Sequence, residues 1–297
     1  MRARVGESIL RLWSDSGARS LFVVGTGKNV GKTVTMRAIY RACIEAGVTC
    51  ALTSIGRDGE AVDLGDAAPK PRLWLEPSTV IATARNVLPT SPASELLALT
   101  PYHTAAGALA YARVRSSSHY ELIGPPSASA LRAVVGDLLA FAQNALIDGS
   151  VDRIAALAGG DDAIVVSCGA GAAQTVGEAV DDVRALVVRL RTLRFEGGDA
   201  RAIDGALTPA IVAQLIRERE TRAVVVRDPT QIMLSGKAAL YAFDQLTIRC
   251  RRPLRVIAAT VASIGGEQVF DPRALARDVA RATGLPTFDV YAAERAA

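Results

Sequence analysis

Apolar residues occur along this chain in two alternating patterns, short continuous runs and longer stretches with helical spacing. Continuous apolar runs are typical of strands buried in a parallel sheet, whereas apolar positions three and four residues apart are typical of amphipathic helices. A strand, a helix and a second strand in succession predict a right-handed parallel crossover. The predicted strands lie at residues 21–25, 49–55, 145–148 and 163–167, and the predicted helices run to about residue 46 after the first strand, from about 127 to 141, and from 176 to 193.

In the rest of the chain, prolines and glycines mark where helices and strands end. Prolines between residues 66 and 101 disfavour long helices, and short strands are expected at 72–75, 80–82 and 108–114. After a glycine-rich linker candidate at 196–199 the alternation of strand and helix resumes, with paired strands at 246–250 and 255–262. We therefore predict an α/β fold with a mainly parallel sheet flanked by helices, divided into a first domain at residues 1–195 and a second α/β lobe at residues 196–297.

Composition excludes several classes of function. The 297 residues are 50% hydrophobic, yet no apolar stretch is long and charge-free enough to span a bilayer, and the first residues lack the apolar core of a signal peptide. We expect a cytoplasmic protein with no membrane partner. The net charge of +4 comes from scattered arginines, and aromatic residues make up 5%, so we expect no nucleic-acid binding. Four widely spaced cysteines, with His103 and His119, match no metal or catalytic spacing.

The first strand leads into the sequence Gly-Thr-Gly-Lys-Asn-Val-Gly-Lys-Thr at residues 25–33, and a helix follows. Backbone N–H groups of such a turn, together with the positive end of the next helix, can bind phosphate oxygens. Lys32 would reach the β- and γ-phosphates, and the Thr33 hydroxyl would bind Mg²⁺. The candidate nucleotide contacts are Thr26, Gly27, Lys28, Asn29, Val30, Gly31, Lys32, Thr33 and Val34.

This stretch departs from the common pattern G-x-x-x-x-G-K-[ST], because Thr26 stands where the first glycine belongs. A glycine-rich surface turn is the alternative interpretation. The pattern G-T-x-x-x-V-G-K-T nevertheless resembles the deviant phosphate loop of dethiobiotin synthetase, whose class includes nitrogenase iron protein and chromosome-partitioning ATPases. This resemblance implies a P-loop NTPase fold, with residues 1–195 as the nucleotide-binding domain and ATP and Mg²⁺ as cofactors. The chain lacks that synthetase's Lys-Pro pair and its Glu-Gly-Ala-Gly-Gly signature, which weakens the implication of biotin synthesis.

Two acidic residues are candidate partners for Mg²⁺. Asp58 lies in a polar loop after the second strand, and Asp148 ends the strand at 145–148 as a Walker-B-like carboxylate would. Glu60 and Asp63 are possible substitutes for Asp58, and Asp152 is the less favoured neighbour of Asp148. The alternative without a metal is an ordinary acidic surface loop for Asp58 and a turn-forming Asp-Gly pair for Asp148.

A run of small residues, Cys-Gly-Ala-Gly-Ala-Ala at 168–173, follows the strand at 163–167. Small side chains let the backbone come close to a neighbour. That neighbour is either a ligand at the edge of the sheet or the following helix. As evidence for a dinucleotide site the Gly-x-Gly is weak, because Gln174 stands where a third glycine belongs.

A looser resemblance runs over most of the chain, through G-T-G-K-N-V-G-K-T, S-I-G-R-D-G-E, L-I-D-G-S-V-D-R and V-R-D-P-T. In this order the motifs resemble the phosphate-loop subunit of a lysine 5,6-aminomutase reactivase, which implies an ATPase that frees damaged cobalamin from its mutase. We therefore expect an ATP hydrolase acting on a partner protein, with Lys32, Asp58 and Asp148 as its catalytic residues. The alternatives are a ligase that activates a small carboxylic acid and a nucleotide-binding module without turnover. A homodimer remains open.

Overall fold

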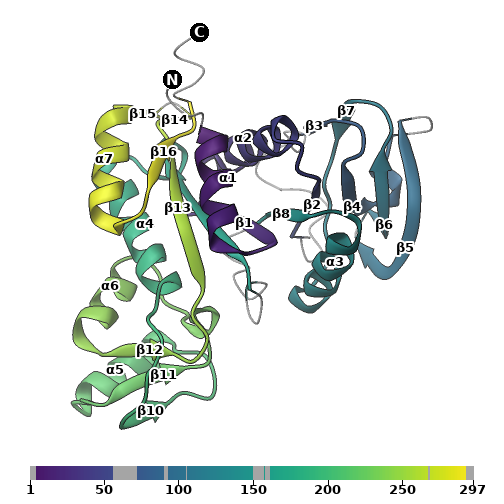
Figure 1. The fold of residues 1–297 in the computed structure, drawn as a ribbon. Helices are drawn as coiled ribbons and strands as arrows, with labels where there is room; N and C mark the ends of the chain where they lie inside the picture. Colours follow the sequence, from purple (N-terminus) through teal and green to yellow (C-terminus); the bar gives the residue numbers. More distant parts are fainter. Residues whose placement is uncertain are drawn as a thin grey trace. The chain divides into compact units, whose positions relative to one another are not determined.

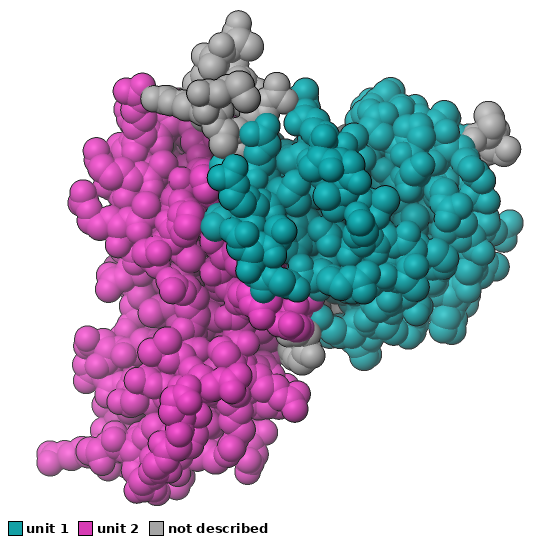
Figure 2. Space-filling model, viewed as in Figure 1, with its two compact units in different colours: residues 1–23, 33–156 teal, residues 24–32, 157–297 magenta. Residues whose placement is uncertain are grey.

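The computed structural model describes residues 5–55, 72–89, 93–104, 106–149, 157, 161–266 and 268–291. The chain divides into two compact units (Figure 2). Unit 1 contains residues 1–23 and 33–156, and unit 2 contains residues 24–32 and 157–297. The predicted boundary at 195/196 lies inside unit 2.

Unit 1 is an α/β layer in which buried strands carry helices on their faces. Continuous apolar runs form its central strands, and β1 is buried along its whole length. Its elements are α1 (Val5–Ser16), β1 (Ser20–Gly25), α2 (Lys32–Glu45), β2 (Cys50–Ser54), β3 (Leu73–Leu75), β4 (Val80–Ala84), η1 (Arg85–Val87), β5 (Ser94–Thr104), β6 (Gly107–Val114), β7 (Ser118–Tyr120), α3 (Ala128–Phe141) and β8 (Asn144–Asp148). In Figure 1, α2 and α3 lie on opposite sides of β2 and β8.

Unit 2 repeats the alternation of strand and helix. In three of its helices a side chain at the N-cap accepts a hydrogen bond from an otherwise unpaired backbone N–H of the first turn. These caps are Thr175 for α4, Thr208 for α5 and Asp271 for α7. Its elements are β9 (Ala163–Gly169), η3 (Ala170–Ala172), α4 (Val176–Leu190), β10 (Ala200–Ala202), α5 (Pro209–Arg217), β11 (Ala223–Val226), η4 (Pro229–Gln231), α6 (Gly236–Gln245), β12 (Ile248–Cys250), β13 (Arg255–Ala262), β14 (Ile264–Gly265), β15 (Gln268–Val269), α7 (Pro272–Thr283) and β16 (Thr287–Asp289).

The central sheet has nine strands in the order β16-β13-β9-β1-β8-β2-β4-β6-β5. It is mostly parallel: β8 pairs in parallel with both β1 and β2, and β13 pairs in parallel with β9 and β16. Only the β4–β6 and β5–β6 pairs among those described in this sheet are antiparallel. The predicted α/β class with a mainly parallel sheet flanked by helices is therefore confirmed.

Two features differ from the sequence analysis. The strands predicted to pair at 246–250 and 255–262 do not pair: β12 joins β11 and β10 in a separate three-stranded sheet, whereas β13 joins β9 and β16. The connection between them lacks the Asn-Gly or Asp-Gly turn that a tight hairpin favours, so it carries the chain from one sheet to the other. The long strand β5 was not predicted, because it contains Pro101. The strand order ends at β5, and a proline is tolerated on an edge strand.

None of the helices in the described ranges combines the length and the apolar character needed to cross a bilayer.

Candidate functional site

The glycine-rich stretch forms a loop between a buried strand and a helix, as the sequence predicted. Strand β1 ends at Gly25, and α2 begins at Lys32. Two residues of the loop have left-handed backbones, Asn29 with φ 55° and Gly31 with φ 84°. A glycine at the second position relieves the steric cost that a side chain would have in that conformation. The chain thus reverses tightly before the helix starts.

The Lys32 side chain folds back across this loop. Its ammonium donates a hydrogen bond to the Gly27 carbonyl, with Nζ and O 2.6 Å apart. Its methylene stem lies so close to Gly25 that a Cβ added there would stand 3.0 Å from the lysine Cγ and Cδ, and 2.6 Å from a Val30 methyl group. Because Gly25 has no side chain, the methylene stem of Lys32 has space to cross the loop. The Lys32 ammonium therefore lies against the loop backbone.

One backbone amide of the loop is hydrogen-bonded to the sheet. The Thr26 N–H donates to the Ser167 carbonyl of β9 at 2.9 Å, so this predicted nucleotide contact ties the loop to the neighbouring strand. The amides that remain candidates for binding an anion are those from Gly27 to Lys32. Within this range, the side chains of Lys28 and Asn29 are exposed at the loop tip, whereas Val30 is 1% exposed and anchors the loop in the core.

The run of small residues after β9 packs against the loop. A Cβ added at Gly171 would overlap the carbonyl oxygen of Asn29, and one added at Gly27 would stand 2.7 Å from the Cβ of Ala172. The sequence analysis expected this run to approach a ligand or its own helix. The structure shows a further neighbour, the glycine-rich loop, whose backbone requires small residues at these positions.

A second support comes from the end of β13. A Cβ at Gly31 would stand 2.8 Å from the Cβ of Ala262, and a Cβ at Gly265 would overlap the backbone nitrogen of Gly171. The sequence analysis did not identify Ala262, Ala172 or Gly265. The only signal in the sequence was their small size beside a strand end, which is too common to select them.

Cys168, the first residue of the small run, is buried. Burial raises the pKa of its thiol to about 12, and the nearby negative charge of Asp182 adds to the shift. The thiol therefore stays protonated at neutral pH, and a protonated thiol is a poor nucleophile and metal ligand.

Asp148 ends strand β8, as predicted. In the register of unit 1 it lies opposite Val23 of β1 and Ser54 of β2. Backbone hydrogen bonds continue past it, from the Gly149 N–H to the Val23 carbonyl at 2.8 Å and from the Ile55 N–H to the Asp148 carbonyl at 3.0 Å. The half-buried carboxylate thus stands at the carboxyl end of three adjacent parallel strands, the usual ligand edge of an open α/β sheet.

Asp58, Glu60, Asp63 and Asp152 lie outside the described residues. Thr33 and Val34 occupy the first turn of α2 and are partly exposed. Within the described ranges, no three His, Cys, Asp or Glu side chains gather as a metal-binding group. The carboxylate and hydroxyl oxygens at Asp148 and Thr33 are nevertheless the ligand type that Mg²⁺ takes, since it commonly keeps several waters and few protein ligands.

Comparison of the chain with protein-family models, with curated proteins and with solved structures gives no match. Support for a phosphate site therefore comes from the loop geometry.

Proposed function

We propose that the chain is a Mg²⁺-dependent P-loop ATPase of the deviant class that acts on a partner protein, in the manner of an aminomutase reactivase subunit. The observation that carries the proposal is the lysine folded across a closely packed glycine loop, with its ammonium 2.6 Å from the Gly27 carbonyl oxygen. A glycine-rich surface turn would not need close packing on both sides, as this loop has against the Gly171 backbone and the Ala262 side chain.

The chemistry asked of the residues is modest. Phosphoryl transfer needs positioning and neutralisation of charge more than covalent catalysis. The loop amides from Gly27 onward and the start of α2 would hold the phosphates, and Lys32 would neutralise the transferred group. Thr33 and Asp148, together with the predicted Asp58, would hold Mg²⁺ or its waters. When bound, the metal would supply charge stabilisation to the transferred phosphoryl group.

The first test is thermal melting of the full chain with Mg²⁺ and ATP, GTP, ADP or no nucleotide. A ligand that binds only the folded state raises the melting temperature. We expect a selective increase with Mg·ATP. Absence of a shift with every nucleotide, at concentrations up to about 10 mM, would return residues 25–33 to a structural turn.

A lysine of the loop and a lysine far from it in the sequence provide a matched pair of variants. Lys32→Ala should lower the affinity for Mg·ATP by at least about 100-fold, because it removes the charge that crosses the loop. Lys237→Ala, at an exposed position in α6, should change it by less than about threefold. Both proteins should melt within a few degrees of the parent without nucleotide. Equal losses in the two variants would contradict the role given to Lys32.

Turnover distinguishes the partner hypothesis from the alternatives. A partner-remodelling ATPase should hydrolyse ATP slowly alone and faster with its protein target, for which a cobalamin-dependent aminomutase is the first choice. Turnover that requires only a small carboxylic acid would identify a ligase instead. Binding with no turnover under either condition would leave a nucleotide-binding module.

A further inference from the structure

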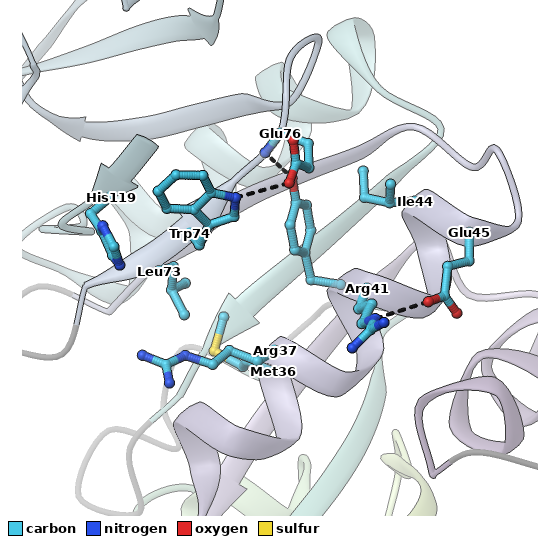
Figure 3. A pocket seen from close by; sticks show the side chains of 10 residues that line it. Met36, Arg37, Arg41, Ile44, Glu45, Leu73, Trp74, Glu76 and His119 are labelled. Carbon is cyan, nitrogen blue, oxygen red and sulfur yellow. Dashed lines mark hydrogen bonds and ion pairs between the residues drawn. The ribbon is translucent and has the colours of Figure 1, made fainter. Parts of the chain in front are cut away.

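A cavity of about 700 Å³ lies in unit 1, between α2 and the short β3–β7 ribbon (Figure 3). Two neighbouring rows of α2 form one wall, Met36, Tyr40 and Ile44 in the first and Arg37, Arg41 and Glu45 in the second. Leu73, Trp74 and Glu76 form the facing wall with His119. The volume falls in the range of small-molecule sites.

The cavity has an apolar floor and an amphipathic rim. Met36, Tyr40 and Leu73 are at most 6% exposed, so the floor belongs to the core. At the rim, Trp74 is 50% exposed and Ile44 is 38% exposed. An indole left half in water at the mouth of an apolar cavity offers aromatic surface that a ligand would bury.

The indole is held in a defined position. Its Nε1 donates to Glu76 Oε1 at 2.9 Å, and its ring meets the His119 ring edge to face, with centroids 5.0 Å apart. The two residues face each other across the β3–β7 pair. Figure 3 shows the indole between His119 and Glu76. Because its polar atom is already satisfied, the ring can act as a rigid apolar wall.

The charged groups around the cavity differ in the hydrogen-bonding capacity that they have left for a ligand. Both carboxylate oxygens of Glu76 accept hydrogen bonds, one from Trp74 and one from the Ser117 hydroxyl. Arg41 pairs with Glu45 at 2.9 Å. Glu76 keeps its negative charge, but both of its oxygens already accept hydrogen bonds, and Arg41 is paired with Glu45. Arg37 is therefore the lining charge with the most hydrogen-bonding capacity left for a ligand.

Arg37 is the lining cation without a carboxylate partner in the described part of the chain. One guanidinium nitrogen donates to the Arg72 carbonyl at 2.9 Å, which fixes the side chain against the start of β3. A guanidinium has five N–H donors in a planar fork that matches a carboxylate. The side chain is therefore held at the cavity with donors left for a ligand.

From these contacts we infer that the cavity is a binding site for a small organic acid, with its apolar or aromatic body against Trp74 and Met36 and its carboxylate on Arg37. The site lies along α2 beyond its first turn and is formed wholly by residues of unit 1. It does not depend on the proposed nucleotide site.

The test uses three probes that share one ring and differ in head group: 3-phenylpropionate, 3-phenylpropanamide and 3-phenylpropylamine. Calorimetry on the full chain should give an affinity for the carboxylate about tenfold above that for the amide, with the amine weakest. Equal affinities, a preference for the amine, or no binding of any probe up to about 10 mM would overturn the inference.

Variants assign the preference to residues. Arg37→Met keeps the stem and should reduce the preference for carboxylate over amide to about one. Arg41→Met, which removes one half of an existing ion pair, is the matched control and should keep most of the preference for carboxylate over amide. Trp74→Ala should weaken all three probes about equally. An unchanged carboxylate preference in a folded Arg37→Met protein would contradict the assignment.

Discussion

The glycine loop of unit 2 and the cavity of unit 1 are built on opposite principles. Around the loop, small residues let one backbone touch another, so that a single added Cβ at Gly171 would overlap the Asn29 carbonyl. Around the cavity, large side chains such as Trp74 and Met36 form the lining. Binding through backbone amides needs a rigid, closely supported main chain, whereas binding of an apolar body needs bulky walls with space between them.

The difference implies unequal tolerance to mutation. The loop has little room for a methyl group at Gly25, Gly27 and Gly31, where an added Cβ would stand 2.6–2.8 Å from neighbouring side-chain atoms. At the supporting residues Gly171 and Gly265 the neighbours are backbone atoms, which cannot rotate away. The rim of the cavity is half exposed and can lose a side chain without creating a buried void. Four predictions test this contrast.

The largest effect is expected at Gly171. Gly171→Ala should lower the affinity for Mg·ATP by about 100-fold, close to 2.7 kcal/mol, because the new methyl group displaces the loop at Asn29. Gly205→Ala is the matched control, since nothing lies within 4 Å of a Cβ there and its backbone is not left-handed. Affinity measured by calorimetry that is alike in the two variants would show that the loop yields easily.

A smaller effect is expected at the strand end of β8. Asp148→Asn keeps the size of the side chain but removes its charge, and should lower the affinity for ATP about tenfold when Mg²⁺ is present. In EDTA the variant and the parent should bind ATP equally. A loss that persists without Mg²⁺ would mean that Asp148 supports the fold instead of the metal.

The cavity rim should respond weakly in stability. Trp74→Ala should lower the free energy of unfolding by about 1 kcal/mol, because half of the indole is already in water and a single hydrogen bond to Glu76 is lost. Urea denaturation provides the measurement. A loss of several kcal/mol would show that the indole is part of the core and would remove the contrast with the loop.

The smallest response is expected from the thiols. All four cysteines are buried, and burial raises the pKa of Cys168 to about 12 and that of Cys250 to about 11. A pH of 8 is below the pKa of both thiols, so both stay protonated. A thiol reagent should therefore label almost none of the folded protein. Labelling should appear only on unfolding in urea. Rapid labelling of Cys168 in the native protein would show that the support of the loop opens in solution.

Much of the fold could be predicted because the signals were local. The buried strand before residue 25, the helix after it, and the helix that begins near residue 127 follow from the apolar pattern of a few adjacent residues. The predicted pairing of 246–250 with 255–262 was wrong, because pairing depends on distant partners. Pro101 hid strand β5, since a proline is compatible with a strand only if that strand lies at an edge.

By itself the sequence determined the α/β class, the order of strand, glycine loop and helix, and the position of Asp148 at a strand end. These depend on periodicity and on neighbouring residues, which the chain carries directly. Only the tertiary structure decided that Gly171 and Gly265 support the loop, and that Arg37, Trp74 and His119 border one cavity. Such contacts join residues far apart in the chain, and the size or charge of a single residue does not reveal which distant residue will lie beside it.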